Sequence, residues 1–206
     1  MLHNTPFVFR YLYPKSVVWD IKNSNNCIYL TFDDGPNQQV TPKVLDILEK
    51  YNIKATFFMV GNNVQNNLSL FNDIVDLKHS VGGHTFNHIK ATKVSYLQYK
   101  NEIDEVAKMV NSKLFRPPHG ILPPIWAKKI SVEYKIVMWS VISGDFSSKL
   151  SPQQCLNVTN KYTKSGSIIV FHDSIKAAPN MLEILEDYIQ HCLDKGYNFE
   201  KIPRSI

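Results

Sequence analysis

Residues 27–36 read Cys-Ile-Tyr-Leu-Thr-Phe-Asp-Asp-Gly-Pro and combine a core strand with an abrupt stop. The first four residues are an uninterrupted apolar run, which predicts a buried strand. Gly35-Pro36 ends any strand or helix, so Asp33 and Asp34 lie where the strand runs out. Two like charges are costly to bury side by side unless a cation or a shared proton offsets them. Taken alone, the stretch is equally consistent with a solvated Asp-Asp-Gly turn.

Outward from this stretch, short apolar runs alternate with helical patterns along the whole chain. Strands are expected at about 27–32, 55–60, 79–83, 113–116, 135–140, 167–171 and 197–199. Helices are expected at about 66–78, 95–111 and 123–133. Another helix should begin at Thr41-Pro42, with Thr41 as its N-cap, and another at Ser151-Pro152. The last should run from Pro179 to about 195.

The strand patterns are continuous apolar runs rather than alternating ones, which is typical of a parallel sheet covered by helices. About six to eight strand–helix units fit into 206 residues. The expected fold class is therefore α/β, either a distorted (β/α) barrel with about 6–8 parallel strands covered by helices or an open doubly wound sheet.

The composition is that of one ordinary folded domain, with 44% hydrophobic and 20% charged residues. The net charge of +5 is compatible with an acidic or cell-wall partner, but solvated surface lysines are the favoured explanation. Basic residues form no dense stripe interleaved with aromatics, which argues against nucleic acid. The three cysteines, Cys27, Cys155 and Cys192, are scattered, so neither a disulfide framework nor a cysteine zinc site is expected.

The N-terminal part carries no 7–15-residue apolar core followed by a cleavage site, so no signal peptide is expected. No apolar stretch approaches 18 residues, so no membrane span is expected either. On this basis the predicted location is cytoplasmic, unless a leader is missing from the sequence. We divide the chain into an N-terminal cap at 1–26 and a single domain at 27–206.

Polar clusters follow nearly every predicted strand at its carboxyl end. They are Asp33-Asp34, the pair His84 and His88, the segment 116–120, Asp145, and His172-Asp173. In barrels and open α/β sheets the carboxyl ends of parallel strands converge on one site. We therefore expect these clusters to form a single functional site.

Two of these clusters contain types of residue that suit metal chemistry and proton transfer. His84 and His88 are four residues apart and can reach one metal if the segment turns helically, although surface or capping histidines fit the same spacing. An aspartate from a neighbouring strand end completes a two-histidine, one-carboxylate set with open positions. His172 is either a satisfied core histidine or, beside a metal, a candidate general acid.

The segment 116–120, Arg-Pro-Pro-His-Gly, is a rigid turn, because its two prolines fix the backbone while the glycine permits a close approach. A fixed backbone N–H in such a turn is able to stabilise an oxyanion. The turn alone is equally compatible with a tight structural loop.

Taken together, these clusters resemble the five motifs of the polysaccharide deacetylase family, the NodB homology domain of carbohydrate esterase family 4. The resemblance runs in order from about Ile28 to Asp173. Thr31–Pro36 is similar to the first motif, which implies that Asp33 is the catalytic base and Asp34 a metal ligand. The segment 84–88, His-Thr-Phe-Asn-His, resembles the second, which implies that His84 and His88 are ligands.

The remaining motifs are matched with departures. In the third, the resemblance implies that Arg116 orients the base, while His119 replaces an aromatic residue whose backbone N–H serves the oxyanion beside Pro118. In the fourth, Asp145 would tune the catalytic histidine, and Phe146 replaces the usual tryptophan. In the fifth, His172 would be the acid, and Val170 replaces the leucine of the acetyl pocket.

The resemblance implies a distorted (β/α) barrel that binds one divalent metal, usually zinc and sometimes cobalt or nickel. It implies a hydrolase of linear amides that removes N-acetyl groups from sugars of the chitin or peptidoglycan type, with a metal-bound water, an aspartate base and a histidine acid. The expected partner is an N-acetylated oligo- or polysaccharide, and the oligomeric state is open. The alternatives are an O-acetyl esterase on xylan or other glycans and a non-catalytic carbohydrate-binding relative.

Overall fold

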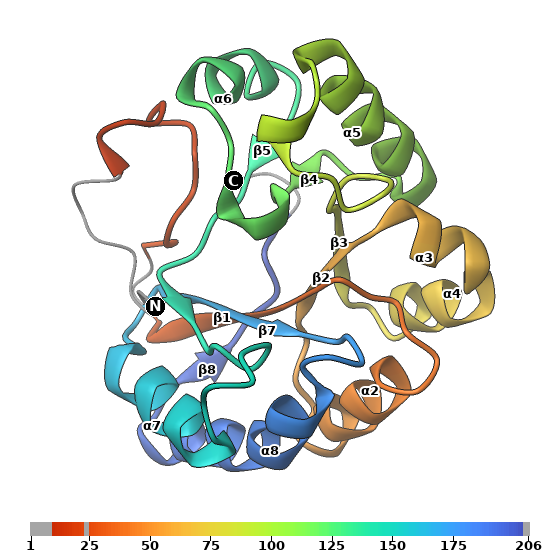
Figure 1. Cartoon of the computed structure of the whole chain (residues 1–206). Helices are drawn as coiled ribbons and strands as arrows, with labels where there is room; N and C mark the ends of the chain where they lie inside the picture. The colour runs from red at the N-terminus through yellow and green to blue at the C-terminus, as the bar shows by residue number, and fades with distance from the viewer. Residues whose placement is uncertain (1–9, 23–24, 204–206) are drawn as a thin grey trace.

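The computed structural model describes residues 10–22 and 25–203, in which helices surround a central parallel sheet (Figure 1). The strands are β1 (Cys27–Asp33), β2 (Thr56–Met59), β3 (Ser80–Gly83), β4 (Leu114–Phe115), β5 (Lys135–Ile136), β6 (Val141–Ile142), β7 (Ile168–His172) and β8 (Asn198–Phe199). Their order in the sheet is β5-β4-β3-β2-β1-β7-β6, with β8 paired to β1, and the sheet curls into an open barrel.

The helices lie on the outside of this sheet (Figure 1). They are α2 (Thr41–Lys50), α3 (Gly61–Asn66), α4 (Leu68–Asp76), α5 (Tyr96–Val110), α6 (Pro124–Ile130), α7 (Pro152–Tyr162) and α8 (Ala178–Asp194). Two 3-10 turns, Ala91–Lys93 and Pro118–Gly120, belong to loops at the carboxyl ends of the strands. The predicted distorted (β/α) barrel is confirmed.

One expected strand, 135–140, proves to be two short strands that belong to opposite edges of the sheet. β5 pairs with β4, whereas β6 pairs with β7. The segment between them crosses the open side of the barrel, where Val137 forms a bridge with Val18 of the N-terminal part. An apolar run predicts burial but not its pairing partners, so the sequence did not indicate this crossing.

Two details of the helices also differ from expectation. The helical region before residue 78 is interrupted at Asn67, so that α3 already begins at Gly61 and α4 follows separately. Thr41 is the first residue of α2 rather than its N-cap, and its hydroxyl donates instead to Asp173. By contrast, Ser151 caps α7 as predicted, in a reciprocal capping box with Gln154.

The core forms between the sheet and its helices because β1 is buried along its whole length. Phe32 of β1 stacks on Phe57 of β2 with ring centroids 5.1 Å apart, and it also contacts Phe171 of β7. Each fully buried aromatic of this size contributes about 1.5–3 kcal/mol through burial. This packing fixes β1 at the centre of the sheet, so its last residues are held rigidly.

Among the described residues, no helix is long and apolar enough to cross a membrane. Residues 1–9 and 23–24 of the predicted cap lie outside the described part of the chain. Both the division at residue 26 and the cytoplasmic location stay predictions.

Buried His79 makes stability depend on pH. Its ring Nδ1 accepts a hydrogen bond of 3.1 Å from the backbone N–H of Ala55. Burial, with the charges of Lys54 and Lys201, lowers the pKa of His79 from 6.5 to about 4. The native state therefore binds fewer protons than the unfolded chain, so stability is full above about pH 6.5 and falls as pH drops toward 4.

We expect His79 to contribute at most about 3 kcal/mol to this loss. Urea unfolding at pH 7.5 and pH 5 measures it, with His79→Gln as the variant that keeps an acceptor but cannot titrate. The variant should lose less stability between the two pH values than the wild type does. Equal losses in both proteins would show that His79 is not the responsible group.

Candidate active site

The predicted polar clusters converge on one cavity of about 230 Å³ at the carboxyl ends of the strands. In the register of β1 and β7, Asp33 lies beside His172, and Thr31 lies beside Val170 one layer deeper in the barrel. The cavity is lined by Asp33, Asp34, His84, His88, Pro117, His119, Gly120, Trp139, Ile142, Phe146, His172 and Lys176. The convergence expected from the strand ends is therefore observed.

Asp34, His84 and His88 form a group suited to a metal ion. Each offers one ligand atom, and these atoms all lie within 4.8 Å of one another. Nε2 of His88 is 3.2 Å and Nε2 of His84 is 3.7 Å from the same Oδ1 of Asp34. Two imidazoles and a carboxylate on one side of an ion leave its other positions open, as catalytic sites require.

The protonation of these groups also suits a metal. Nδ1 of His84 donates to the carbonyl oxygen of Arg116 at 2.8 Å, which directs the Nε2 lone pair toward Asp34. Burial lowers the pKa of His84 to about 4, so the ring is neutral near pH 7. Burial alone would raise the pKa of Asp34, but the hydrogen bond to His88 and the neighbouring histidine charges hold it well below its usual range.

The backbone that carries the ligands adopts left-handed conformations, which are uncommon for residues other than glycine. Asp34, Thr85, His88 and His119 have φ values of 81°, 58°, 54° and 60°. For β-branched Thr85 such a conformation is a genuine outlier. Strain of this kind persists only where surrounding contacts impose it, and it gathers at functional sites.

Two neighbouring helices impose the shape of the histidine segment. The first N–H groups of α3, at Gly61 and Asn62, donate to the carbonyl oxygens of Thr85 and Phe86. Glu102 on α5 accepts from both the backbone N–H and the side-chain amide of Asn87, at 2.7 and 2.8 Å. The segment between the two metal-ligand candidates is thus held from both sides.

Arg116 is fully buried and forms an ion pair with Asp33. Its Nη1 lies 2.7 Å from Oδ1 of Asp33 and 2.7 Å from the hydroxyl of Thr31. The guanidinium also donates to the carbonyl oxygens of Val137 and Met138, in the segment that crosses the barrel. Removing one partner of a buried ion pair typically lowers the free energy of unfolding by about 3–5 kcal/mol. Arg116 therefore stabilises the fold in addition to holding the carboxylate of Asp33.

Asp145 holds His172 by two contacts. Its Oδ1 is 2.8 Å from Nδ1 of the imidazole, and its Oδ2 accepts from the backbone N–H of His172 at 2.7 Å. Burial would lower the pKa of His172, but the charges of Asp145, Asp34 and Asp33 and the hydrogen bond to Asp145 raise it to about 9. The ring is therefore protonated near pH 7, with Nε2 left to face the cavity.

Asp173 is a buried carboxylate that fixes the loop carrying Asp34. It accepts from the backbone N–H of Gly35 at 3.0 Å and from the hydroxyl of Thr41 at 2.6 Å. A Cβ at Gly35 would lie 2.0 Å from Oδ2 of Asp173, so only glycine allows this approach. Burial and the charge of Asp34 raise the pKa of Asp173 to about 7, against the hydrogen bonds from Thr41 and Gly35.

We expect Asp173→Ala to weaken metal binding about tenfold, the lower end of typical losses for groups that support ligands. Asp173→Asn should largely restore binding, because its amide oxygen still accepts from Gly35. Calorimetric titration of the metal-free proteins measures both, with exposed Asp187→Ala as a charge-matched control. Unchanged affinity in a folded Asp173→Ala protein would remove Asp173 from this role.

Some residues near the cavity were not expected, and some expected ones do not line it. Val170 and Pro118 are buried but do not line the cavity, so their predicted roles in the acetyl pocket and oxyanion site stay predictions. Trp139, Ile142 and Lys176 line it instead. The first two lie within or just beyond the segment interpreted as one strand, and an exposed lysine in a loop carries no sequence signal of its own.

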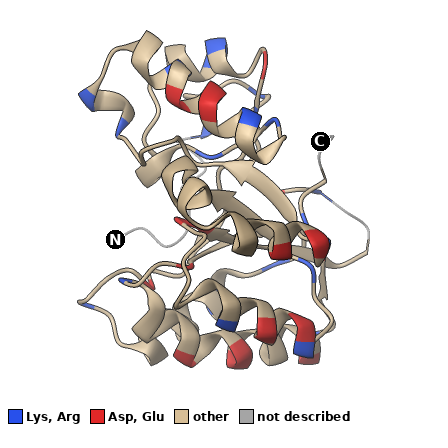
Figure 2. Cartoon of the chain, turned by 90° about the vertical axis from the view of Figure 1, so that its right-hand side faces the viewer, with Lys and Arg blue, Asp and Glu red and all other residues tan. Residues whose placement is uncertain are grey.

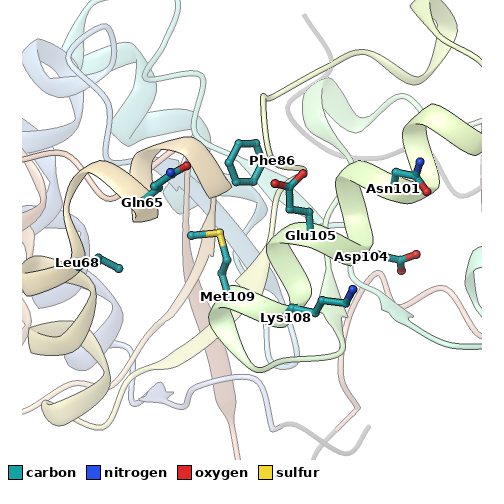
Figure 3. A pocket seen from close by; sticks show the side chains of 8 residues that line it. All are labelled: Gln65, Leu68, Phe86, Asn101, Asp104, Glu105, Lys108 and Met109. Carbon is teal, nitrogen blue, oxygen red and sulfur yellow. The ribbon is translucent and has the colours of Figure 1, made fainter.

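A larger hollow of about 590 Å³ lies elsewhere, between α3–α4 and α5 (Figure 3). Phe86, Glu105 and Met109 face each other there, with Gln65 and Leu68 on the opposite helices. No histidine or cysteine lines it, and its titratable residues, Asp104, Glu105 and Lys108, all come from the single helix α5. The smaller cavity is therefore the candidate active site despite its size.

Comparison with known proteins agrees with this geometry. The family model for polysaccharide deacetylase matches residues 20–134. A peptidoglycan-N-acetylglucosamine deacetylase of Bacillus cereus is 32% identical over 191 residues, covering 89% of each chain. An enzyme of the same name from Listeria monocytogenes is 33% identical over 87% of this chain, which spans 38% of that longer protein.

A solved structure extends the likeness to three dimensions. A crystal structure of a peptidoglycan N-acetylglucosamine deacetylase superposes with a TM-score of 0.88 at 29% identity, covering 97% of this chain and 95% of that one. The fold and site define a metal-dependent hydrolase built on a distorted (β/α) barrel. The chain belongs to the polysaccharide deacetylase family, carbohydrate esterase family 4.

Proposed function

We propose that this protein removes the acetyl group from N-acetylglucosamine residues of peptidoglycan, with zinc as its metal. The names of its relatives support this substrate class, and its two-histidine, one-carboxylate group suits zinc. The identity of the metal is the more specific part of the proposal, because cobalt and nickel suit the same ligand atoms as zinc.

The observation that carries the proposal is that one cavity holds two potentially catalytic side chains, each with its own charged partner. Asp33 is paired with Arg116, and His172 is paired with Asp145. The two groups occupy neighbouring positions on β1 and β7, beside the candidate ligands. One carboxylate and one protonated imidazole are the base and acid that amide hydrolysis requires.

A divalent ion held by Asp34, His84 and His88 would supply Lewis-acid polarisation and a nucleophilic water at neutral pH. Asp33 accepts the proton of the attacking water, and Arg116 keeps its carboxylate in place. His172 donates its proton to the amide nitrogen, so that the carbon–nitrogen bond breaks and acetate and a free amine leave. Asp145 holds the imidazole in the orientation that this transfer needs.

We infer that His119 serves the oxyanion of the reaction through its backbone N–H. It lines the cavity with φ of 60°, and its ring packs edge-on against His88 with centroids 4.7 Å apart. Burial and the charges of His88 and two lysines lower its pKa, so the ring is neutral near pH 7. We assign its contribution to the backbone N–H, which any side chain at this position would retain.

An acetate-release panel tests the proposal. The zinc-loaded protein is incubated with peptidoglycan, chito-oligosaccharides and acetylxylan, and acetate is measured against a His88→Ala control. The proposal expects acetate from peptidoglycan and a large loss in the variant. Acetate from acetylxylan alone would establish an O-acetyl esterase, and no acetate from any substrate would favour a non-catalytic relative.

A further inference from the structure

Lys176 lies at the wall of the candidate active site, four residues after His172 in the loop that leads to α8. Its ammonium group is 5.6 Å from the ring centroid of Phe146. Phe146 in turn packs edge-on against His172, with centroids 4.9 Å apart. An aromatic ring therefore holds this cation next to the proposed acid.

Within the described part of the chain, Lys176 forms no ion pair with a carboxylate. The two carboxylates that line the cavity already have basic partners: Asp33 is paired with Arg116, and Asp34 lies beside two histidines. Lys176 is exposed, so its charge is available to a molecule that enters the cavity.

A second lysine adds to the positive charge at this opening. The charges of Lys90 and Lys176 both act on the ring of His119, which lines the cavity and packs against His88. In the side view, several Lys and Arg residues occur at the tips of loops on the left, and others lie on the helices beside Asp and Glu residues (Figure 2). Asp33 and Asp34 also line the cavity, but both already have basic partners, so the charge of Lys176 is left to attract an oppositely charged substrate.

We propose that Lys176 binds a carboxylate of the substrate close to the N-acetyl group that is cleaved, so that the site prefers anionic glycans to neutral polymers of N-acetylglucosamine. The inference rests on the proposed function, in which the substrate is peptidoglycan. Carboxylates occur there either on the lactyl group of peptide-free muramic acid or on the stem peptides. Both sources offer the same group to the ammonium.

The test compares Lys176→Ala and Lys176→Glu with Lys161→Ala. Lys161 is a matched control because it is also exposed, and its ammonium lies 5.5 Å from the ring of Tyr162 but outside the cavity. Acetate release is measured on peptide-free glycan strands, on strands with stem peptides and on neutral chitotetraose. The quantity of interest is the ratio of kcat/KM between an anionic and the neutral substrate.

We expect the ratio to fall three- to tenfold in Lys176→Ala and more than tenfold in Lys176→Glu, mainly through KM, while Lys161→Ala keeps it. The fall should shrink at 0.5 M salt, since screening weakens such a contact. A fall on peptide-free strands identifies the lactyl carboxylate, and a fall only on peptide-bearing strands identifies the stem. An unchanged ratio in both Lys176 variants would overturn the inference.

Binding without turnover separates this inference from the proposed function. Isothermal titration of peptide-free and peptide-bearing strands into wild type and Lys176→Glu reports affinity whether or not acetate is released. Strand binding that weakens in Lys176→Glu, together with no acetate from any substrate, would overturn the proposed activity and keep the carboxylate site. Equal affinities in the two proteins would overturn the site itself.

Discussion

Asp33→Asn should release acetate about 10²–10⁴ times more slowly than the wild type, the usual cost of losing a general base. Its metal affinity should stay close to that of the wild type, because Asp33 is not part of the group formed by Asp34, His84 and His88. The amide oxygen still accepts from Arg116, so the fold should survive. Single-turnover acetate release and metal titration measure the two effects separately.

Asp34→Asn is the matched control, since it removes the adjacent and chemically identical carboxylate. Consecutive residues of an extended chain point in different directions, and only Asp34 lies within reach of both histidines. This variant should lose metal affinity and regain part of its rate at high zinc concentration. If Asp33→Asn is instead the variant that loses metal, the two roles are reversed.

Asp145→Asn is expected to give the second large effect, through the pKa of His172. The charge of Asp145 and its hydrogen bond to Nδ1 help to raise that pKa to about 9. Because His172 must be protonated to act as the acid, activity is present at lower pH and is lost as pH rises through this pKa. Without the charge of Asp145 the pKa of His172 falls. The pH at which the rate declines on the alkaline side should therefore drop by about one pH unit or more.

The rate at pH 7 should fall about 10–100-fold in Asp145→Asn, as for other groups that orient a reacting residue. His172→Ala should be slower still and should show no alkaline limb from this group. The control is the far-ultraviolet circular dichroism of each variant, which reports the fold. An unchanged pH profile in folded Asp145→Asn would mean that another group sets the alkaline limb.

The sequence predicted the position of the active site more completely than the residues that line its cavity. Asp34 follows β1, whereas His84 and His88 follow β3, and the rule that parallel strands converge at their carboxyl ends predicts that the three residues meet. Periodicity located β1 and β7 closely, because both are long, buried and paired on both sides. A strand that is buried along its length appears in the sequence as an unbroken apolar run, which is easy to recognise.

The remaining features depend on contacts that a local pattern does not contain. β5 and β6 are two-residue strands on opposite edges of the sheet, and Arg116 donates to the carbonyl oxygens of Val137 and Met138 in the segment between them. Thr41 was expected to cap a helix because a threonine before a proline commonly does so. Its hydroxyl instead bonds Asp173, a residue 132 positions away.

The central claim is that this chain deacetylates its substrate only with one metal ion held by Asp34, His84 and His88. The most direct measurement is the rate of acetate release from peptidoglycan as zinc is added stepwise to metal-free protein. The account predicts a rate near zero without zinc, a linear rise that ends at about one equivalent per chain, and no comparable rise in His88→Ala. Full activity in the metal-free protein, or the same titration curve in His88→Ala, would contradict it.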